Sequence, residues 1–552
     1  MKKNQLLLSI FSTIALGTAT AQTPTLIKDI NTSVGSISDL IGDKTSYFMP
    51  FGKDKIFFCA RDNNADGNNP YLSDGTAAGT IKLSDVLAGD FAPTYYHLYD
   101  AKSGKVFFTG KQKVAGKDTD VEPWVSDGTA AGTKKLKDIG PGVNDSSEPV
   151  EYTAFNNKVC FAVNSTGNGL WISDGTEAGT TLLATTYASQ LQVYKNKLYF
   201  VGKDKLTFGT TSLWESDGTV AGTKLIFQPQ GFAEELSRIH VGSKGMYLEI
   251  KTSNKAILNA YNIATNKVTK LQTQSQGAIG GTVQTINGKD YFLTLKDIFV
   301  TGSSNALVET DATLAGTKNV KTFTKTGNAT LMAAETFLIL NAEDTNGEEL
   351  WISDGTAAGT KEIDLNKGTA GSFPRNFKRI GNTIYFSADY NNGTAVGIEP
   401  CQTDGTVAGT KLLADLNPGA TGSDPANFVL ATLGEKTNLV FSAIGNTNLG
   451  KEPYKYEIKV TTPIRETQNT SENDIFTVQP NPAKGTIFIN TPTLNQANAD
   501  LNIYNMQGAL VKKENITTAQ QAIDIQNLAT GTYILQITTK DAKTQTQKLV
   551  IF

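Results

Sequence analysis

The sequence predicts an all-β fold built from repeated sheets, and three observations support this prediction. An eight-residue phrase, Ser-Asp-Gly-Thr-x-Ala-Gly-Thr, recurs along the chain. Short runs rich in Val, Ile, Phe, Tyr and Trp separate its copies, and such runs bounded by turn residues are typical of strands. The chain also contains 51 glycines, and this composition favours turns and short strands over helices.

The phrase returns at a nearly constant spacing. Five copies are complete, a sixth begins with Thr403, and a seventh is altered to Thr-Asp-Ala-Thr-Leu-Ala-Gly-Thr; in chain order they start at residues 73, 126, 173, 216, 310, 353 and 403. One interval of 94 residues (310 − 216) equals two periods with one unreadable copy between them. A fixed period in this range indicates repeated units that cannot bury their apolar faces alone. Because a catalytic residue is needed only once, we interpret the phrase as structural.

One period is easiest to follow between residues 328 and 365. A first strand is predicted over 328–335 and a second over 336–342, followed by a polar loop. A third strand over 349–353 leads into the phrase, and a fourth covers 361–365. Four antiparallel strands in 40–50 residues is the pattern of a β-propeller blade.

The phrase has the chemistry of a hairpin connection. Asp354 can accept hydrogen bonds from backbone groups two residues further on. Gly355 and Gly359 can both adopt a positive φ without steric cost. Turn formation therefore explains why these residues are present, and no catalytic role is needed to explain them.

Counting second strands gives the number of blades. Nine are predicted, at Lys55–Ala60, Lys105–Thr109, Lys158–Val163, Lys197–Val201, Met246–Ile250, Asp290–Leu295, Thr336–Ala342, Thr383–Ala388 and Asn438–Ala443. The unreadable copy then falls in 257–271, where Ala264-Thr265-Asn266-Lys267 supplies a tighter turn. Nine blades exceeds the usual four to eight. An eight-bladed ring, with one weak unit in 225–330 used otherwise, is the alternative.

The two ends of the repeat region predict how the ring closes. After the last third strand, 452–457, no phrase and no fourth strand follow. Residues 25–30 instead match the fourth-strand text of 135–139. We therefore expect residues 22–458 to form one closed propeller whose N-terminal strand completes the last blade and removes its exposed edge.

The N-terminus and the charge balance bear on location. Residues 1–21 combine a basic start, an apolar run over 6–16 and an Ala-x-Ala ending, which predicts a signal peptide cut before Gln22. The apolar run is too short to span a bilayer, so we expect a mature protein that is soluble outside the cytoplasm, with no transmembrane segment. With 50 basic and 53 acidic residues, the chain has no basic footprint for nucleic acid and no polybasic membrane patch.

The C-terminal part differs from the repeats. Residues 459–474 are polar and are predicted to be a linker, and residues 475–552 read as a small β-sandwich. Three segments mark this unit, Pro480-Asn481-Pro482-Ala483, Leu528-Ala529-Thr530-Gly531-Thr532-Tyr533 and the basic-then-apolar end Lys548–Phe552.

These segments resemble the type A C-terminal sorting domain of the type IX secretion system of Bacteroidota. The resemblance implies a partnership with that secretion machinery and export across the outer membrane. It also implies cleavage of the tail, followed by release or by attachment to a surface lipopolysaccharide. The repeats are similar to the Glu-Leu-Trp-x-x-Asp-Gly-Thr-x-x-Gly-Thr proteins found with such tails, as in Glu349–Thr360, and that label implies no settled activity.

One loop has the pattern of a calcium site. Asp62, Asn64 and Asp66 alternate before Gly67, which supplies oxygen ligands and a residue for a sharp turn. The glutamate that an EF-hand has at its twelfth position is absent, and Ser73 stands there. A solvated polar turn is the alternative interpretation, and no other cofactor is predicted. Poorer versions of the pattern occur at 344–347 and 118–120.

No catalytic residue is assigned from the sequence. Cys59, Cys160 and Cys401 are predicted to be small buried strand residues, and His97 and His240 to be strand residues outside any nucleophile motif. Glutamates recur in the third strands, at Glu122, Glu349, Glu399 and Glu452. Their recurrence favours a structural bond over catalysis.

Two functions of different class remain open. The first is a secreted or surface-displayed binding or adhesion module that recognises glycan or protein through loops at one propeller face. The alternative is an extracellular glycan-active enzyme, a lyase or hydrolase, with its site at the central channel. Propellers host both, so the fold does not decide. The absence of an unrepeated catalytic motif favours binding.

Overall fold

A computed structural model describes most of the chain. The described residues are 23–30, 48–62, 68–88, 97–114, 117–141, 145–203, 210–230, 234–252, 255–271, 279–294, 305–324, 330–368, 370–391, 393–419, 421–445, 450–458, 476–479, 485–490, 499–505, 509–518, 520–529, 531–539 and 544–551. The predicted signal peptide and linker lie outside these ranges. The chain divides into two compact units, Met1–Thr462 and Pro463–Phe552. All regular structure in the described ranges is strand, and no helix there is long and apolar enough to cross a membrane.

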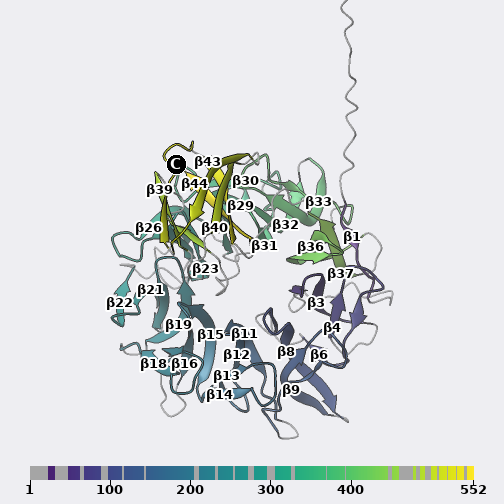
Figure 1. The fold of residues 1–552 in the computed structure, drawn as a ribbon. Helices are drawn as coiled ribbons and strands as arrows, with labels where there is room; N and C mark the ends of the chain where they lie inside the picture. The colour runs from purple at the N-terminus through teal and green to yellow at the C-terminus, as the bar shows by residue number, and fades with distance from the viewer. Residues whose placement is uncertain are drawn as a thin grey trace, which may run out of the picture. The chain divides into compact units, whose positions relative to one another are not determined.

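The described part of the first unit contains nine antiparallel sheets (Figure 1). The first three consist of β2 (Met49–Phe51), β3 (Lys55–Ala60), β4 (Asn69–Ser73) and β5 (Ile81–Lys82); β6 (Leu87–Ala88), β7 (His97–Asp100), β8 (Lys105–Val114), β9 (Lys117–Ser126) and β10 (Lys134–Lys135); and β11 (Pro149–Phe155), β12 (Lys158–Val163), β13 (Gly169–Ser173) and β14 (Thr181–Ala184). The next three consist of β15 (Tyr187–Tyr194), β16 (Lys197–Lys203), β17 (Ser212–Ser216) and β18 (Lys224–Phe227); β19 (Glu235–Val241), β20 (Met246–Thr252), β21 (Lys255–Asn262) and β22 (Lys267–Lys270); and β23 (Ile279–Ile286), β24 (Lys289–Thr294), β25 (Asn305–Thr310) and β26 (Lys318–Phe323). The last three consist of β27 (Leu331–Ala333), β28 (Leu338–Asp344), β29 (Gly347–Ser353) and β30 (Lys361–Ile363); β31 (Arg375–Ile380), β32 (Thr383–Asn391), β33 (Ala395–Thr403) and β34 (Lys411–Leu412); and β35 (Ala426–Leu433), β36 (Lys436–Ile444), β37 (Lys451–Glu457) and β1 (Thr25–Leu26).

The sheets follow the periodicity of the sequence. All nine predicted second strands are present, as β3, β8, β12, β16, β20, β24, β28, β32 and β36. In the fifth sheet, β21 and β22 flank the short turn predicted at 264–267. The repeat units therefore coincide with sheets because each contains the apolar runs and turns that four adjacent strands require.

Strand β1 pairs with β37, although the two are far apart in the sequence. Thr25 lies opposite Lys455, and the Ile27 N–H donates to the Pro453 carbonyl at 2.8 Å. The same bond joins Leu136 to Pro123 in the second sheet at 2.7 Å. The N-terminal strand thus occupies the position that a fourth strand takes elsewhere.

Apolar side chains fill the spaces between consecutive sheets. Phe57 and Cys59 of the first sheet, for example, share a buried cluster with Phe108 and Trp124 of the second. Ile27 and Ile30, next to β1, share a buried cluster with residues of the ninth sheet and with Ile56 of the first sheet. Each sheet therefore buries its faces against its neighbours, which is the reason a single repeat could not fold alone.

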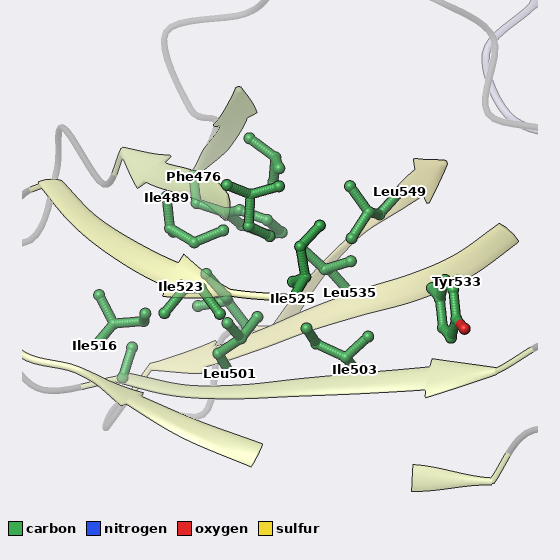
Figure 2. Close-up of a cluster of buried hydrophobic side chains, with 14 of the residues drawn as sticks. Phe476, Ile489, Leu501, Ile503, Ile516, Ile523, Ile525, Tyr533, Leu535 and Leu549 are labelled. Carbon is green, nitrogen blue, oxygen red and sulfur yellow. The ribbon is translucent and has the colours of Figure 1, made fainter. Parts of the chain in front are cut away.

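The described residues of the second unit form two sheets that share one core. One sheet contains β38 (Thr477–Gln479), β39 (Thr486–Asn490) and β42 (Gln520–Asp524), and the other contains β40 (Ala499–Asn505), β41 (Leu510–Ile516), β43 (Gly531–Thr539) and β44 (Thr544–Ile551). Figure 2 shows Ile489 and Ile523 of the first sheet meeting Leu501 and Leu535 of the second, all 2% exposed or less. Alternating apolar positions along each strand produce this two-layer core.

Candidate functional site

The repeated phrase forms the same hydrogen-bonded turn in every copy. In the seventh sheet the Thr356 N–H and hydroxyl both donate to Asp354 Oδ1, at 2.8 and 2.7 Å. The Ser353 and Thr360 hydroxyls lie 2.7 Å apart and are buried. These bonds, chiefly from Thr356, hold the pKa of Asp354 below its usual range. The serine and aspartate are therefore occupied in shaping the turn, as the repetition predicted.

The two glycines of the phrase have different roles. Gly355 has a φ of +89°, as predicted. The expectation of a positive φ at Gly359 is wrong, because it is not among the residues with positive φ. A Cβ on Gly359 would instead lie 2.0 Å from Oδ1 of Asp354. Glycine is required there because the aspartate side chain folds directly over the backbone.

Buried glutamates form a second repeated structure at the opposite ends of the third strands. Each anchors the connector, the segment that runs from one sheet to the first strand of the next. Glu349 accepts from the Leu365 N–H at 3.1 Å and from the Ser372 N–H at 2.9 Å, and also from the Ser372 hydroxyl. Burial raises the pKa of Glu349 to about 7, while these donors act in the opposite direction.

Three other glutamates repeat this arrangement. Glu122 accepts from the Ile139 and Gly140 N–H groups, both at 3.0 Å, and from the Ser147 hydroxyl at 2.6 Å. Glu399 likewise accepts from the Ser423 hydroxyl. The Ile30 N–H donates to Glu452 Oε2 at 3.1 Å, so the N-terminal segment is held like a connector. The structural interpretation of these glutamates fits their bonds.

The connectors also share a Ser-x-Pro pattern that the sequence reasoning missed. It occurs at 147–149, 372–374 and 423–425, and in each case the serine and proline are buried. The middle residues, Glu148, Phe373 and Asp424, have φ values of 49°, 49° and 44°. Each middle N–H donates to the carbonyl of the residue before the buried glutamate, at 3.0 to 3.2 Å. The signal was visible as Ser-x-Pro placed 25, 23 and 24 residues after each glutamate.

The middle side chains point away from this anchored backbone. Glu148 is exposed, Asp424 is half-buried, and Phe373 is 49% exposed. The connector ends of the sheets thus present a different side chain on the same backbone geometry. Residues that a rigid scaffold presents on loops are well placed for recognition.

The predicted calcium loop is described only at its first residue. Asn64 and Asp66 lie outside the described residues. The Asp62 carboxylate contacts the Lys82 ammonium at 2.8 Å, and Lys82 also contacts Asp85 at 2.5 Å. A cation bound by Asp62 would therefore have to share that carboxylate with Lys82, so the residue fits a calcium site only in part.

The two loops with poorer versions of the calcium pattern, 118–120 and 344–347, also contact other side chains. Asp120, Glu122 and Asp138 bring carboxylate oxygens within 4.8 Å of one another. Lys135 contacts Asp120 at 2.6 Å and Asp138 at 3.8 Å, which supplies a positive charge to this group. In the other loop, the Asn346 side-chain amide donates to Glu362 at 2.7 Å.

The cysteines and histidines lie in strands, and all of them except the half-buried His97 are buried. Cys59, Cys160 and Cys401 are all buried, in agreement with the sequence prediction. Burial raises the pKa of Cys160 to about 12, so its thiol stays protonated at neutral pH. His97 and His240 lie in β7 and β19 as predicted, and burial lowers the pKa of His240.

Comparison with known proteins identifies the second unit. The family model for the secretion system C-terminal sorting domain matches residues 477–552. This match indicates export through the type IX secretion system to the cell surface or the extracellular space. No curated protein sequence matches the chain.

Several solved structures show a distant likeness to the chain. They include a Dos1 propeller (11% identity, TM-score 0.39, 64% of this chain and 89% of that chain) and a puromycin-hydrolyzing peptidase of Mycobacterium tuberculosis (12% identity, TM-score 0.37, 67% and 63%). An oligogalacturonate lyase in complex with manganese aligns with 10% identity, a TM-score of 0.35, and 75% and 98% of the two chains. The chain spans about three fifths of the length of the puromycin-hydrolysing enzymes that it resembles.

Proposed function

We propose that this protein is an extracellular binding module, a propeller that displays recognition residues on its connectors and reaches the cell exterior through its C-terminal sorting domain. The observation that carries the proposal is the anchored connector. Glu148, Phe373 and Asp424 share one backbone geometry, and all three are at least partly exposed, but two are carboxylates and one is aromatic. A scaffold that repeats its supports and varies its exposed residues is suited to binding.

We further propose that the nine sheets are the blades of one closed ring, completed by β1. Support comes from equivalent bonds in distant sheets. Ile27 and Ile30 make the backbone contacts to Pro453 and Glu452 that Leu136 and Ile139 make to Pro123 and Glu122. In a closed ring each sheet has a neighbouring sheet on both sides, and β1 covers the edge of β37 that would otherwise be unpaired.

The chemistry of the described residues favours binding over catalysis. The buried carboxylates that recur, such as Glu349 and Glu399, already accept two backbone N–H groups or a serine hydroxyl. The aspartates of the phrase are held in their turns in the same way. A general acid or base must instead reach the substrate that it protonates or deprotonates.

The binding role is tested with the chain without its predicted signal peptide, residues 22–552, on arrays of extracellular polysaccharides and proteins. A parallel screen measures release of reducing ends and of unsaturated sugars from the same polysaccharides. Saturable binding without turnover is expected. Turnover of a bound glycan would instead support the alternative, a glycan-active lyase or hydrolase.

The export role is tested by exchanging the tail. Removing residues 475–552 should retain the protein in the periplasm of a host with a type IX system. Fusing those residues to an unrelated protein with a signal peptide should bring that protein to the surface or the medium. Export of the truncated chain would contradict the role of the tail and leave the binding proposal standing.

A further inference from the structure

Phe373 is an unusual residue for its position. It is 49% exposed, and its φ of +49° lies in the left-handed region that bulky side chains rarely adopt. The strained backbone itself has a structural purpose, because it directs Ser372 toward Glu349. That purpose does not require an aromatic side chain, since Glu148 and Asp424 occupy the same place in other connectors.

A charged network begins two residues after this aromatic residue in the sequence. Arg375, two residues further along, contacts Asp424 of the next connector through its guanidinium group. Asp424 also contacts the Lys451 ammonium at 2.9 Å. Burial alone would raise the pKa of Asp424, but Lys451 and Arg375 outweigh it and hold the pKa below its usual range. The Arg375 and Asp424 side chains remain 40% and 32% exposed, so solvent or a ligand can reach both.

An aromatic middle residue with an arginine two positions later occurs in one of the three Ser-x-Pro connectors. The residue equivalent to Arg375 is Val150 after Glu148 and Ala426 after Asp424. The segment between the seventh and eighth sheets is therefore where an exposed aromatic residue is followed, two positions later, by an arginine that pairs with a carboxylate. Asn376 fastens it to the next connector by donating to the Pro425 carbonyl at 3.1 Å.

We propose that Phe373, Arg375 and Asp424 form a saccharide-binding subsite. This inference rests on the proposed binding function and names its ligand class. An aromatic ring offers a flat apolar surface to the C–H face of a pyranose, while a guanidinium and a carboxylate can donate to and accept from neighbouring hydroxyls. Because one carboxylate, Asp424, pairs with both Lys451 and Arg375, the three groups carry one net positive charge, so the subsite suits sugar hydroxyls and also accommodates an acidic sugar.

The test compares two substitutions at left-handed backbone positions in the chain without its signal peptide. Phe373→Asn introduces a residue that tolerates the left-handed region, so the thermal midpoint should stay unchanged or rise. Affinity for the best-binding polysaccharide from a panel of glucan, mannan, xylan, alginate and pectin should fall at least ten-fold. Glu435→Asn, the matched control at an exposed hairpin residue with a φ of +65°, should have the same effect on the midpoint and leave affinity unchanged. Phe373→Trp should retain binding because it keeps an aromatic face.

Three results would overturn the proposal. Unchanged affinity in Phe373→Asn, with wild-type binding intact, would remove the subsite and leave the binding function in place. Wild-type binding to proteins alone would exclude the saccharide class. Absence of any binding by the folded wild-type chain would remove both the proposed function and the subsite.

Discussion

The two ends of the sheets differ in what they repeat. At the hairpin end, the copies reproduce every main bond of the turn, and even the altered copy has Thr313 donating to Asp311 at 2.6 Å. In the fifth sheet Asn262 takes the aspartate's place and accepts from the Ala264 and Thr265 N–H groups. At the connector end, the buried serine and proline are repeated while the exposed residue between them changes.

This difference separates the positions that folding requires from the positions at which we propose recognition. The hairpin end contributes turn chemistry that any four-stranded sheet of this kind needs. The connector end uses a buried anchor, such as Glu349 with Ser372, to hold a side chain that packing does not determine. We place recognition at the connector end because the side chains that vary there are at least partly exposed, while buried anchors hold the backbone beneath them.

The largest effect is expected from removing the strand that completes the ninth sheet. Deleting residues 22–30 from the chain without its signal peptide takes away β1 and the buried Ile27 and Ile30. The exposed edge of β37 should then lower the thermal midpoint sharply and promote aggregation. Calorimetry and light scattering measure both. Leu26→Ala, at a position 37% exposed, is the control with a small expected effect; a deletion that melts like the parent would contradict ring closure.

A smaller loss is expected at the hairpin end. Gly355→Val places a β-branched residue at a φ of +89°, with its Cβ 2.2 Å from the Tyr291 hydroxyl oxygen. Strain at such a backbone position costs about 1–3 kcal/mol, and the contact adds to it. Gly381→Val is the matched comparison, because φ is +61° and a Cβ there meets no atom within 4 Å. Denaturant unfolding measures both, and equal midpoints for the two variants would rule out the packing contribution.

The connector end should show a pH dependence. In the folded protein the pKa of Glu349 is raised to about 7 from 4.5, mainly by burial. The stability that depends on its protonation is therefore complete below about pH 4.5 and is lost as pH rises through about 7. Glu349→Gln should remove roughly 1 kcal/mol of this change in unfolding free energy between pH 5 and 8. Glu177→Gln, at an exposed hairpin residue, should preserve the wild-type profile; an identical profile in Glu349→Gln would count against the assignment.

The smallest expected effect concerns calcium at the loop that begins with Asp62. If the loop binds the ion, millimolar calcium should raise the thermal midpoint, because a ligand of the folded state stabilises it by mass action. Asp62→Ala combined with Asp66→Ala should abolish the rise. Asp85→Ala is the control, since it also loses a contact with Lys82 but lies outside the loop. A wild-type midpoint that calcium leaves unchanged would assign the loop as a polar turn.

Much of the architecture follows from local patterns in the chain. The nine second strands and the turn after β21 could be predicted because apolar runs and turn residues act over a few neighbours. The structural role of Glu349 was also predictable, because a residue repeated in several sheets is not a single catalytic group. Similarity between residues 25–30 and 135–139 predicted that the N-terminal strand completes the last sheet, and β1 pairs with β37.

The tertiary structure decided what depends on segments meeting across the chain. The close approach of the Asp354 carboxylate to Gly359 explains that glycine, and no turn rule requires it. Ser-x-Pro was readable in the sequence, but its meaning depends on Ser372 reaching Glu349, 23 residues away. The exposure of Phe373 beside Arg375 and Asp424 likewise arises only when two connectors pack together. Local periodicity determines strands and turns, whereas packing between sheets determines which side chains remain available to a ligand.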